Sequence, residues 1–494
     1  MSAALHFAGS LDGWTLVYAA AQILYLAAFA VTGYFLGLPV NWVSEKRADS
    51  RPAAELPLMV MAYPVLHEDF DTMHSTLVSL GRLDYPRSRY RVIAIPNFDD
   101  PRTIAALHRL KAEFDFLEIL EVPATSDPRW LAVWGSWFGN PNAYWYHTGA
   151  TANVRDLPPK KTRQLIFLFY TLVEQIGTDW VLDYIDADSM PPPDHFRAGA
   201  AGLLQYDVLQ ATNVSGNLLD SMAASLHSFD HMCWDGMMHP HMTANGGHPF
   251  YVLGKGLFYR ARDLYALGGF NPWITIEDPE VGMRLWRHGF RLGIIRAPLI
   301  EEVPRTFYRG IVQRNRWVCG FFQSLGAPLK QMGMPFWRRV QARLNIVPVL
   351  SHPIHVIGMP TGLYALYLFF IAANPFPLWL DVLSALNLAL YTITMGAFYL
   401  NAWRRTALVL DKKSQRIRYM LRVNPIVVFL YHLLWVVPLV IGFAMFLTNR
   451  GKTWIRTQKY DADHRFADSA PEWARPAMPE RQQANEQQGH DKAA

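Results

Sequence analysis

The sequence is poor in cysteine and in charge. Only two cysteines, Cys233 and Cys319, occur among its 494 residues. This number excludes a disulfide framework and their spacing fits no zinc motif, so we expect the soluble part to lie in the cytosol. Charged residues make up 18% of the chain, below the roughly 25% of soluble domains, whereas 51% is hydrophobic. Part of the chain is therefore expected to lie in lipid.

A strong charge of either sign is also lacking. The formal net charge is +5, which is too small to predict nucleic-acid binding. A modest basic excess instead favours contact with anionic lipid headgroups or with a phosphorylated substrate. At 494 residues, the chain exceeds the roughly 150 residues of one typical domain, so two or more folding units are expected.

Residues 14–40 form an uncharged apolar run, longer than the roughly 20 residues needed to cross a bilayer. A secretory signal peptide is the alternative, but the run is too long for one and no basic residue precedes it. We therefore predict a transmembrane anchor and linker over residues 1–50. Lys46, Arg47 and Arg51 follow the run, which places the next domain in the cytoplasm by the positive-inside rule. A bacterial inner (plasma) membrane fits this arrangement.

Transmembrane helices are also predicted within residues 345–450. The candidate spans are residues 345–373, 377–401 and 424–447. The loop 402–423 and the start of the tail are both basic, although one crossing at 424–447 would place them on opposite sides. Either that segment re-enters the membrane, or one side tolerates positive charge, or the number of spans differs by one.

Two further segments flank these spans. Residues 328–344 combine Trp, Phe and Met with Lys and Arg, which is typical of a helix lying in the membrane interface. An ordinary amphipathic helix packed on the preceding domain is the alternative. Residues 451–494 are polar and are expected to be largely disordered.

Short apolar runs alternate with helical patterns over residues 51–327, which predicts an α/β domain with a largely parallel sheet. Strands are expected at 56–63, 90–95, 116–122, 179–186 and 207–214. Helices are expected at 68–81, 101–114, 163–176 and 279–288. Ligands of open α/β sheets bind beyond the carboxyl ends of the strands, so polar residues at those ends are the candidates for a site.

Two acidic pairs are the first candidates. Asp186 and Asp188 follow an expected buried strand, and one or two carboxylates plus substrate phosphates is the set that Mg²⁺ prefers. An acidic turn is the alternative for this pair alone. Glu277 and Asp278 precede Pro279 at an expected helix start, where Asp278 would serve as a cap. A carboxylate facing a cleft there can also accept a proton from a hydroxyl, and both interpretations can hold together.

A third candidate is the run Gln313-x-x-Arg316-Trp317. The Arg side chain offers a planar fork of donors suited to pyrophosphate, and the Trp ring offers a flat apolar face suited to a sugar. Next to a membrane, Arg-Trp alone is more often an interfacial anchor. The presence of both acidic pairs upstream argues against that alternative.

These three motifs, in this order and flanked by apolar helices, resemble the family 2 glycosyltransferases. The similarity is greatest to the processive synthases of cellulose, chitin and hyaluronan. It implies a GT-A fold, a divalent cation (Mg²⁺ or Mn²⁺), a UDP-sugar donor such as UDP-glucose or UDP-N-acetylglucosamine, and inversion at the anomeric carbon. It also implies a growing β-linked polysaccharide as acceptor, export across the bilayer, and accessory subunits.

The resemblance assigns roles to residues of this chain. Asp186 and Asp188 would hold the metal and the diphosphate, and Asp278, beside Glu277, would be the general base. The remaining donor and acceptor contacts would come from Lys160, Lys161, Arg163, Gly254, Lys255, Gln313, Arg316 and Trp317. An Asp-Asp-Gly-Ser sequence usual in the family is here Pro-Asn-Phe-Asp, so either Asn97 or Asp99 would reach the uracil.

Two segments and two rival functions stay open. The insertion 124–160 holds four tryptophans, which predicts either an acceptor-contacting lid or a hydrophobic flap packed on the domain or on lipid. The His-rich stretch 227–248 is interpreted as a polar surface near the membrane, not as a zinc site. The rival functions are a non-processive transferase acting on a lipid carrier and a non-enzymatic membrane component with a degenerate transferase domain.

Overall fold

The structure is a computed structural model that describes residues 13–44, 51–243, 252–346 and 376–448, together with Tyr364, Tyr367, Phe370 and Ile371. In this part of the chain, one sheet has the strand order β3-β2-β1-β4-β6-β5-β7. The strands are β1 (Met59–Pro64), β2 (Tyr90–Ile95), β3 (Leu117–Ile119), β4 (Val181–Tyr184), β5 (Val208–Ser215), β6 (Leu257–Arg260) and β7 (Leu292–Glu301).

The sheet is mixed and largely parallel. Only β6, among the strands described, runs antiparallel, and it pairs with β4 on one side and β5 on the other. The remaining pairings are parallel. This topology confirms the predicted α/β architecture and its five expected strands. The sequence prediction did not include β6 and β7.

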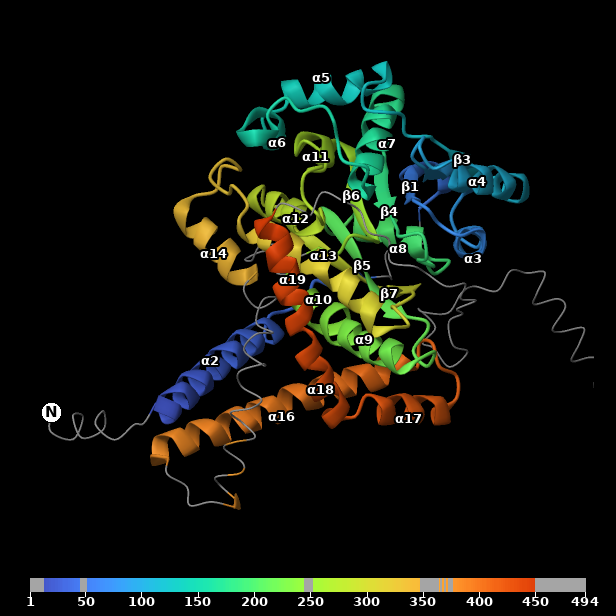
Figure 1. The fold of residues 1–494 in the computed structure, drawn as a ribbon. Coiled ribbons are helices and arrows are strands. Elements are labelled where there is room, and N and C mark those ends of the chain that lie inside the picture. The colour runs from blue at the N-terminus through green and yellow to red at the C-terminus, as the bar shows by residue number, and fades with distance from the viewer. Residues whose placement is uncertain are drawn as a thin grey trace, which may run out of the picture.

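Helices cover both faces of the sheet (Figure 1). They are α3 (Phe70–Leu80), α4 (Pro101–Glu113), α5 (Leu131–Gly139), α6 (Tyr144–His147), α7 (Lys161–Ile176), α8 (His195–Gly202), α9 (Met222–Cys233), α10 (His239–Thr243), α11 (Ala261–Ala266), α12 (Asp278–Arg287) and α13 (Phe307–Leu325). Successive residues of β1 point to opposite faces, so Met59 and Met61 join one apolar core whereas Val60 and Ala62 join the other.

The Trp-rich insertion belongs to one of these cores. Trp130, Trp134, Trp137 and Trp145 are all buried, and the rings of Trp130 and Trp134 stack with centroids 5.5 Å apart. The indole N–H of Trp137 donates to the carbonyl of Gly268 at 3.1 Å. The insertion is therefore packed on the domain, and the alternative of an open lid that offers these rings to an acceptor is wrong.

Three helices of the described chain are long and apolar enough to cross a membrane: Thr15–Leu36, Leu378–Thr406 and Pro425–Leu447. The first two lie in α2 (Gly13–Leu36) and α16 (Leu378–Thr406), which lie side by side (Figure 1). Tyr18 of α2 hydrogen-bonds Ser384 of α16 at 2.7 Å. The predicted span at 345–373 falls almost entirely outside the described residues.

The third apolar segment packs on the sheet domain. It consists of α18 (Pro425–Leu434) and α19 (Val436–Leu447), and it follows the short α17 (Lys413–Arg422). Gly442 of α19 lies so close to α13 that a Cβ atom there would come within 2.7 Å of Val318. The Phe322 ring of α13 also packs on Phe443, with centroids 4.8 Å apart.

The predicted interfacial helix is shorter than expected. Helix α14 spans Phe336–Ile346, whereas residues 328–335 form turns. Gly333 has a φ of 75°, a left-handed backbone conformation that glycine adopts readily and that does not occur within a regular α-helix. The helix therefore begins only after this residue. On α14, Trp337 is 77% exposed and Phe336 is 60% exposed, so the helix presents aromatic rings to its surroundings.

Candidate active site

One cavity brings together residues that lie far apart in the sequence. Both predicted acidic pairs line it, Asp186 with Asp188 and Glu277 with Asp278. The other predicted residues that line it are Lys161, Gly254, Lys255, Gln313, Arg316 and Trp317. The cavity thus contains the carboxylates and the guanidinium that the motifs predicted would meet.

The turn after β4 fixes the first acidic pair. The carbonyl of Ala187 accepts hydrogen bonds from the hydroxyls of Tyr63 at 2.9 Å and Thr76 at 2.8 Å. The Asp188 carboxylate is 4% exposed and accepts from the backbone N–H of Glu302 at 3.0 Å. The Asp186 side chain is 40% exposed. The pair therefore offers one rigid and one accessible carboxylate to the same cavity.

Lys161, at the start of α7, balances these acids. Its Nζ donates to Asp186 Oδ1 at 2.6 Å and to the carbonyl of Gly254 at 2.5 Å, and it lies 4.0 Å from Glu277 Oε1. Burial acts to lower the pKa of Lys161, but Asp186 and Glu277 raise it above its usual value. Lys161 therefore carries its charge at neutral pH and links the two acidic pairs.

Asp278 is half-buried where the chain enters α12. The helix begins at Asp278 itself, and Glu277 at the capping position makes no capping hydrogen bond, so the predicted cap at Asp278 is wrong. Burial and the Glu277 carboxylate raise the pKa of Asp278 well above its usual range, while Lys161 opposes the rise. A raised pKa suits a group that takes a proton from an alcohol and later returns it to water.

Gly254 sets the position of Asp278. A Cβ atom at residue 254 would lie 2.7 Å from Asp278 Oδ1 and 2.8 Å from Oδ2. These distances are shorter than any ordinary carbon–oxygen contact, so only glycine allows the carboxylate to lie where it does. The backbone of residue 254 therefore forms one wall beside the proposed base.

Helix α13 supplies the third motif. Gln313, Arg316 and Trp317 follow i, i+3 and i+4 spacing, which places them on one helical face. Burial lowers the pKa of Arg316 to about 10, although Asp186 acts to raise it, so the guanidinium is still charged at neutral pH. The buried side-chain oxygen of Gln313 has no hydrogen-bond partner among the described residues. This face is thus equipped to bind an anionic or hydroxyl-bearing ligand.

Four predicted residues do not line the cavity. Asn97 is fully buried at the end of β2, and neither polar atom of its amide has a partner among the described residues. Asp99 Oδ1 lies 3.9 Å from Arg163 Nη2 on the neighbouring helix. Lys160 is buried, and its Nζ donates to the carbonyl of Ile274 at 3.4 Å. Their predicted donor contacts stay predictions.

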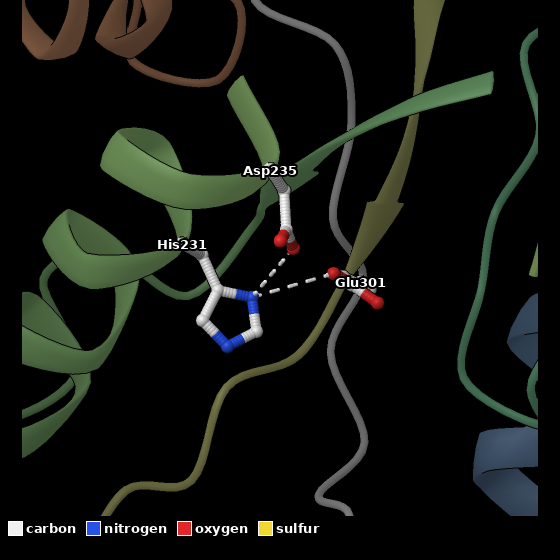
Figure 2. A group of neighbouring side chains, drawn as sticks. All are labelled: His231, Asp235 and Glu301. Carbon is white, nitrogen blue, oxygen red and sulfur yellow. Dashed lines mark ion pairs between the residues drawn. The ribbon is translucent and has the colours of Figure 1, made fainter. Parts of the chain in front are cut away.

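The described part of the His-rich stretch, residues 227–243, does not form a polar surface. His227 and His239 are buried, and the side chain of His231 is only 11% exposed. His231 also lines the cavity with Asp235 and Glu301, and Figure 2 shows these three side chains pointing toward one another. The i, i+4 spacing of His231 and Asp235 is the local signal of this cluster in the sequence, and the sequence analysis did not predict it. His248 lies outside the described residues.

The donor atoms of the cavity suit a hard divalent cation at the first acidic pair. Asp186 and Asp188 place carboxylate oxygens from one short turn in the same cavity. Mg²⁺ and Mn²⁺ prefer oxygen ligands, commonly one or two carboxylates completed by substrate phosphates and water. The residues present therefore fit the cation that the motif predicted.

Comparisons with known proteins give limited matches to individual relatives. A probable glycosyltransferase of Sulfolobus acidocaldarius is 26% identical over 30% of this chain and 31% of its own length. The beta-monoglucosyldiacylglycerol synthase of Synechocystis is 34% identical over 15% of each chain. The match thus spans less than a third of either relative. A mannosyltransferase of Pyrobaculum calidifontis, solved with GDP-Man and Mn²⁺, is 14% identical with a TM-score of 0.48 over 88% of this chain and 97% of its own.

The family comparison covers far more of the chain. Residues 180–447 of the 494 match the model of Glycosyl transferase family group 2. The matched region begins just before β4 and ends with α19, so it includes both acidic pairs and the whole of α13. The match supports a transferase as the enzyme class. Because it extends over more than half of the chain, the protein belongs to Glycosyl transferase family group 2.

Proposed function

We propose that the protein transfers a sugar from a nucleotide-diphosphate sugar, with inversion, to a growing β-linked polysaccharide. UDP-glucose or UDP-N-acetylglucosamine is the proposed donor, and a GT-A-like arrangement of the sheet domain is the proposed framework. The observation that carries the proposal is the convergence of Asp186, Asp188, Asp278 and Arg316 on one cavity.

Asp186, Asp188 and Arg316 would bind the donor diphosphate. A divalent cation held by the two carboxylates supplies neutralisation of charge on the leaving diphosphate when it is bound. Arg316 offers further donors to the same phosphates. Lys161 is committed to Asp186 and Gly254, so its proposed role is to orient Asp186 and to balance the charge of the acidic residues.

Asp278 would act as the general base. It would accept the proton of the acceptor hydroxyl while that oxygen attacks the anomeric carbon from the side opposite the diphosphate. One displacement of this kind converts an α-linked donor into a β-linked product. The close backbone of Gly254 and the charge of Lys161 would hold the carboxylate in line with the attack.

The acceptor has two candidates. A polysaccharide end would stack on Trp317 and hydrogen-bond Gln313, which the motif favours. A lipid acceptor is the second candidate, because one relative is named a beta-monoglucosyldiacylglycerol synthase. The apolar side chains Phe321 and Trp435 on the cavity wall would suit a lipid-linked acceptor as well.

We further propose that the protein is embedded in a bilayer through α2 and α16, with the sheet domain on the cytoplasmic side of a bacterial inner membrane. The length and hydropathy of both helices support their position in a bilayer, and the basic residues that follow α2 favour the cytoplasmic side for the sheet domain. Export of the product, alone or with accessory subunits, would follow from synthesis beside the membrane.

The test uses the full chain purified in nanodiscs. It is incubated with a panel of UDP- and GDP-sugars and with Mg²⁺ or Mn²⁺, with and without chelator, and nucleotide release and product length are measured. Asp278→Asn is expected to retain donor binding and to lose about 10²–10⁴-fold in rate, because a general base contributes that factor. Long products indicate a polysaccharide and single additions to lipid indicate the second candidate. No release with any donor, or full turnover by Asp278→Asn, contradicts the proposed mechanism.

A further inference from the structure

We propose that His231, Asp235 and Glu301 form a second divalent-cation site in the same cavity, apart from Asp186 and Asp188. One ligand atom from each of the three residues lies within 4.8 Å of the other two. The site would bind a divalent transition-metal ion such as Zn²⁺, Mn²⁺ or Co²⁺ without nucleotide, so the proposal does not depend on sugar transfer.

The separations of His231 Nδ1 from the two carboxylates are close to those of tetrahedral coordination. His231 Nδ1 lies 3.4 Å from Asp235 Oδ2 and 3.7 Å from Glu301 Oε1 (Figure 2). Bonds of 2.0–2.2 Å at tetrahedral angles place neighbouring ligand atoms roughly 3.3–3.6 Å apart. Direct hydrogen bonds between the same groups would instead require 2.7–3.2 Å. His231 Nδ1 therefore lies farther from both carboxylates than an ordinary hydrogen bond requires, and close to the separation that a bound ion would span.

Buried polar atoms without partners support the same conclusion. Glu301 is 3% exposed, and its Oε1 atom has no hydrogen-bond partner among the described residues. Both ring nitrogens of His231 also lack one. Buried polar side-chain atoms in folded proteins nearly always have a partner, so this cluster requires one. A cation between the three residues would supply it.

The surrounding residues hold the ligands in place. The other carboxylate oxygen of Glu301 accepts from Lys255, which leaves Oε1 directed at His231. The His231 ring packs against Trp317 with centroids 5.6 Å apart. Asp235 lies in a π-helical turn, Trp234–Met238, directly after α9, and such turns occur frequently at functional sites. Supporting contacts of this kind orient the ligands of metal sites.

The ligand set indicates the class of ion. One imidazole nitrogen and two carboxylate oxygens suit Zn²⁺, Mn²⁺ or Co²⁺, whereas Mg²⁺ prefers oxygen ligands alone in an octahedron. Lys255 contributes one positive charge beside the carboxylates of Asp235 and Glu301. With a divalent cation bound, these side chains and the ion together would carry a net charge of about +1. Three protein ligands would leave a fourth position open to water or to an acceptor hydroxyl.

The test counts cations in the absence of nucleotide. The full chain carrying Asp186→Asn and Asp188→Asn is stripped with chelator, reconstituted in nanodiscs and titrated with Co²⁺ and Zn²⁺. We expect one ion per chain by calorimetry and a visible Co²⁺ absorption band of low coordination number. Because the first acidic pair has been removed, this result cannot come from it. A protein that binds no ion overturns the proposal.

Variants then assign the ion to the cluster. Glu301→Gln keeps the size of the side chain, and Asp235→Asn provides a second change if the first does not fold. Each is expected to weaken Co²⁺ binding by at least about 10–100-fold. His74→Ala is the matched control, because His74 lies on α3 and pairs with a carboxylate, Glu113, in an exposed position. This variant should bind Co²⁺ as tightly as the protein that carries only Asp186→Asn and Asp188→Asn. Unchanged binding in both cluster variants overturns the assignment. Donor turnover is measured separately, so that failure of sugar transfer and failure of ion binding are distinguished.

Discussion

Replacing Gly254 by alanine tests the geometry of the proposed base without touching its chemistry. The added Cβ would lie 2.7 Å from Asp278 Oδ1, whereas ordinary contact begins at 3.4 Å, so the carboxylate must move by about 0.7 Å. A misplacement of about 1 Å can lower the rate about 10²-fold, so we expect Gly254→Ala to lower kcat by about 10–100-fold. This loss corresponds to about 1.4–2.7 kcal/mol of transition-state stabilisation.

Steady-state kinetics with a saturating donor measure the effect of Gly254→Ala, and calorimetric donor titration checks that binding is kept. Gly135→Ala in α5 is the matched control, because a Cβ atom there meets nothing within 4 Å. The control should have the kcat of the unmodified protein. A Gly254→Ala protein that keeps at least half of its kcat would show that catalysis does not depend on the position of Asp278, and the assignment of the base would fall.

Three further predictions follow from other contacts. Because burial and Glu277 raise the pKa of Asp278 while Lys161 lowers it, activity should fall as pH drops through that raised pKa, and Lys161→Met should move this acidic limb to higher pH in a pH–rate profile. An unchanged limb would place the titrating group elsewhere. Asp230→Ala removes the partner of buried Arg314, which donates to it at 2.8 Å, and should lower the free energy of unfolding by about 3–5 kcal/mol in chemical denaturation. Changing both residues to leucine should be milder than Asp230→Ala, and an equal loss would argue against an unpaired charge as the cause. Gly320→Ala adds a Cβ atom 2.1 Å from Ile276 and should destabilise by about 1–3 kcal/mol, whereas Gly139→Ala in open space should not.

The strands that the sequence predicted share one property. Each of β1 to β5 lies in a mainly apolar run beside a turn, although Arg91, Glu118 and Asp183 interrupt β2, β3 and β4. The two strands that were not predicted, β6 and β7, do not lie in such a run. The apolar part of β6 is only three residues long, between Gly256 and Arg260, and β7 contains Arg296 and Pro298. β7 tolerates this proline because it lies at the edge of the sheet.

The site was predictable where residues follow strand ends or share a helix. The Asp186 pair and the α13 motif are local patterns that the sequence shows directly, and their order along the chain with the second acidic pair favoured a site over an acidic turn or an interfacial anchor. Glu301 joins His231 only because β7 pairs with β5, a long-range contact that no local spacing reveals. The sequence also predicted site residues that do not line the cavity. Lys160 and Lys161 are neighbours in sequence, but only Lys161 lines the cavity, because the start of α7 directs the two side chains differently.

The contact of α13 with α19 joins the most apolar segment of the described chain to its polar cavity. Pro425–Leu447 is the most apolar of the three long helices, yet Gly442 brings α19 against Val318, the residue next to Trp317. A tilt of α19 would therefore shift the ring proposed to hold the acceptor while leaving Asp186 and Asp188 in place. On this basis, turnover should respond to bilayer thickness and detergent chain length, whereas donor affinity should not.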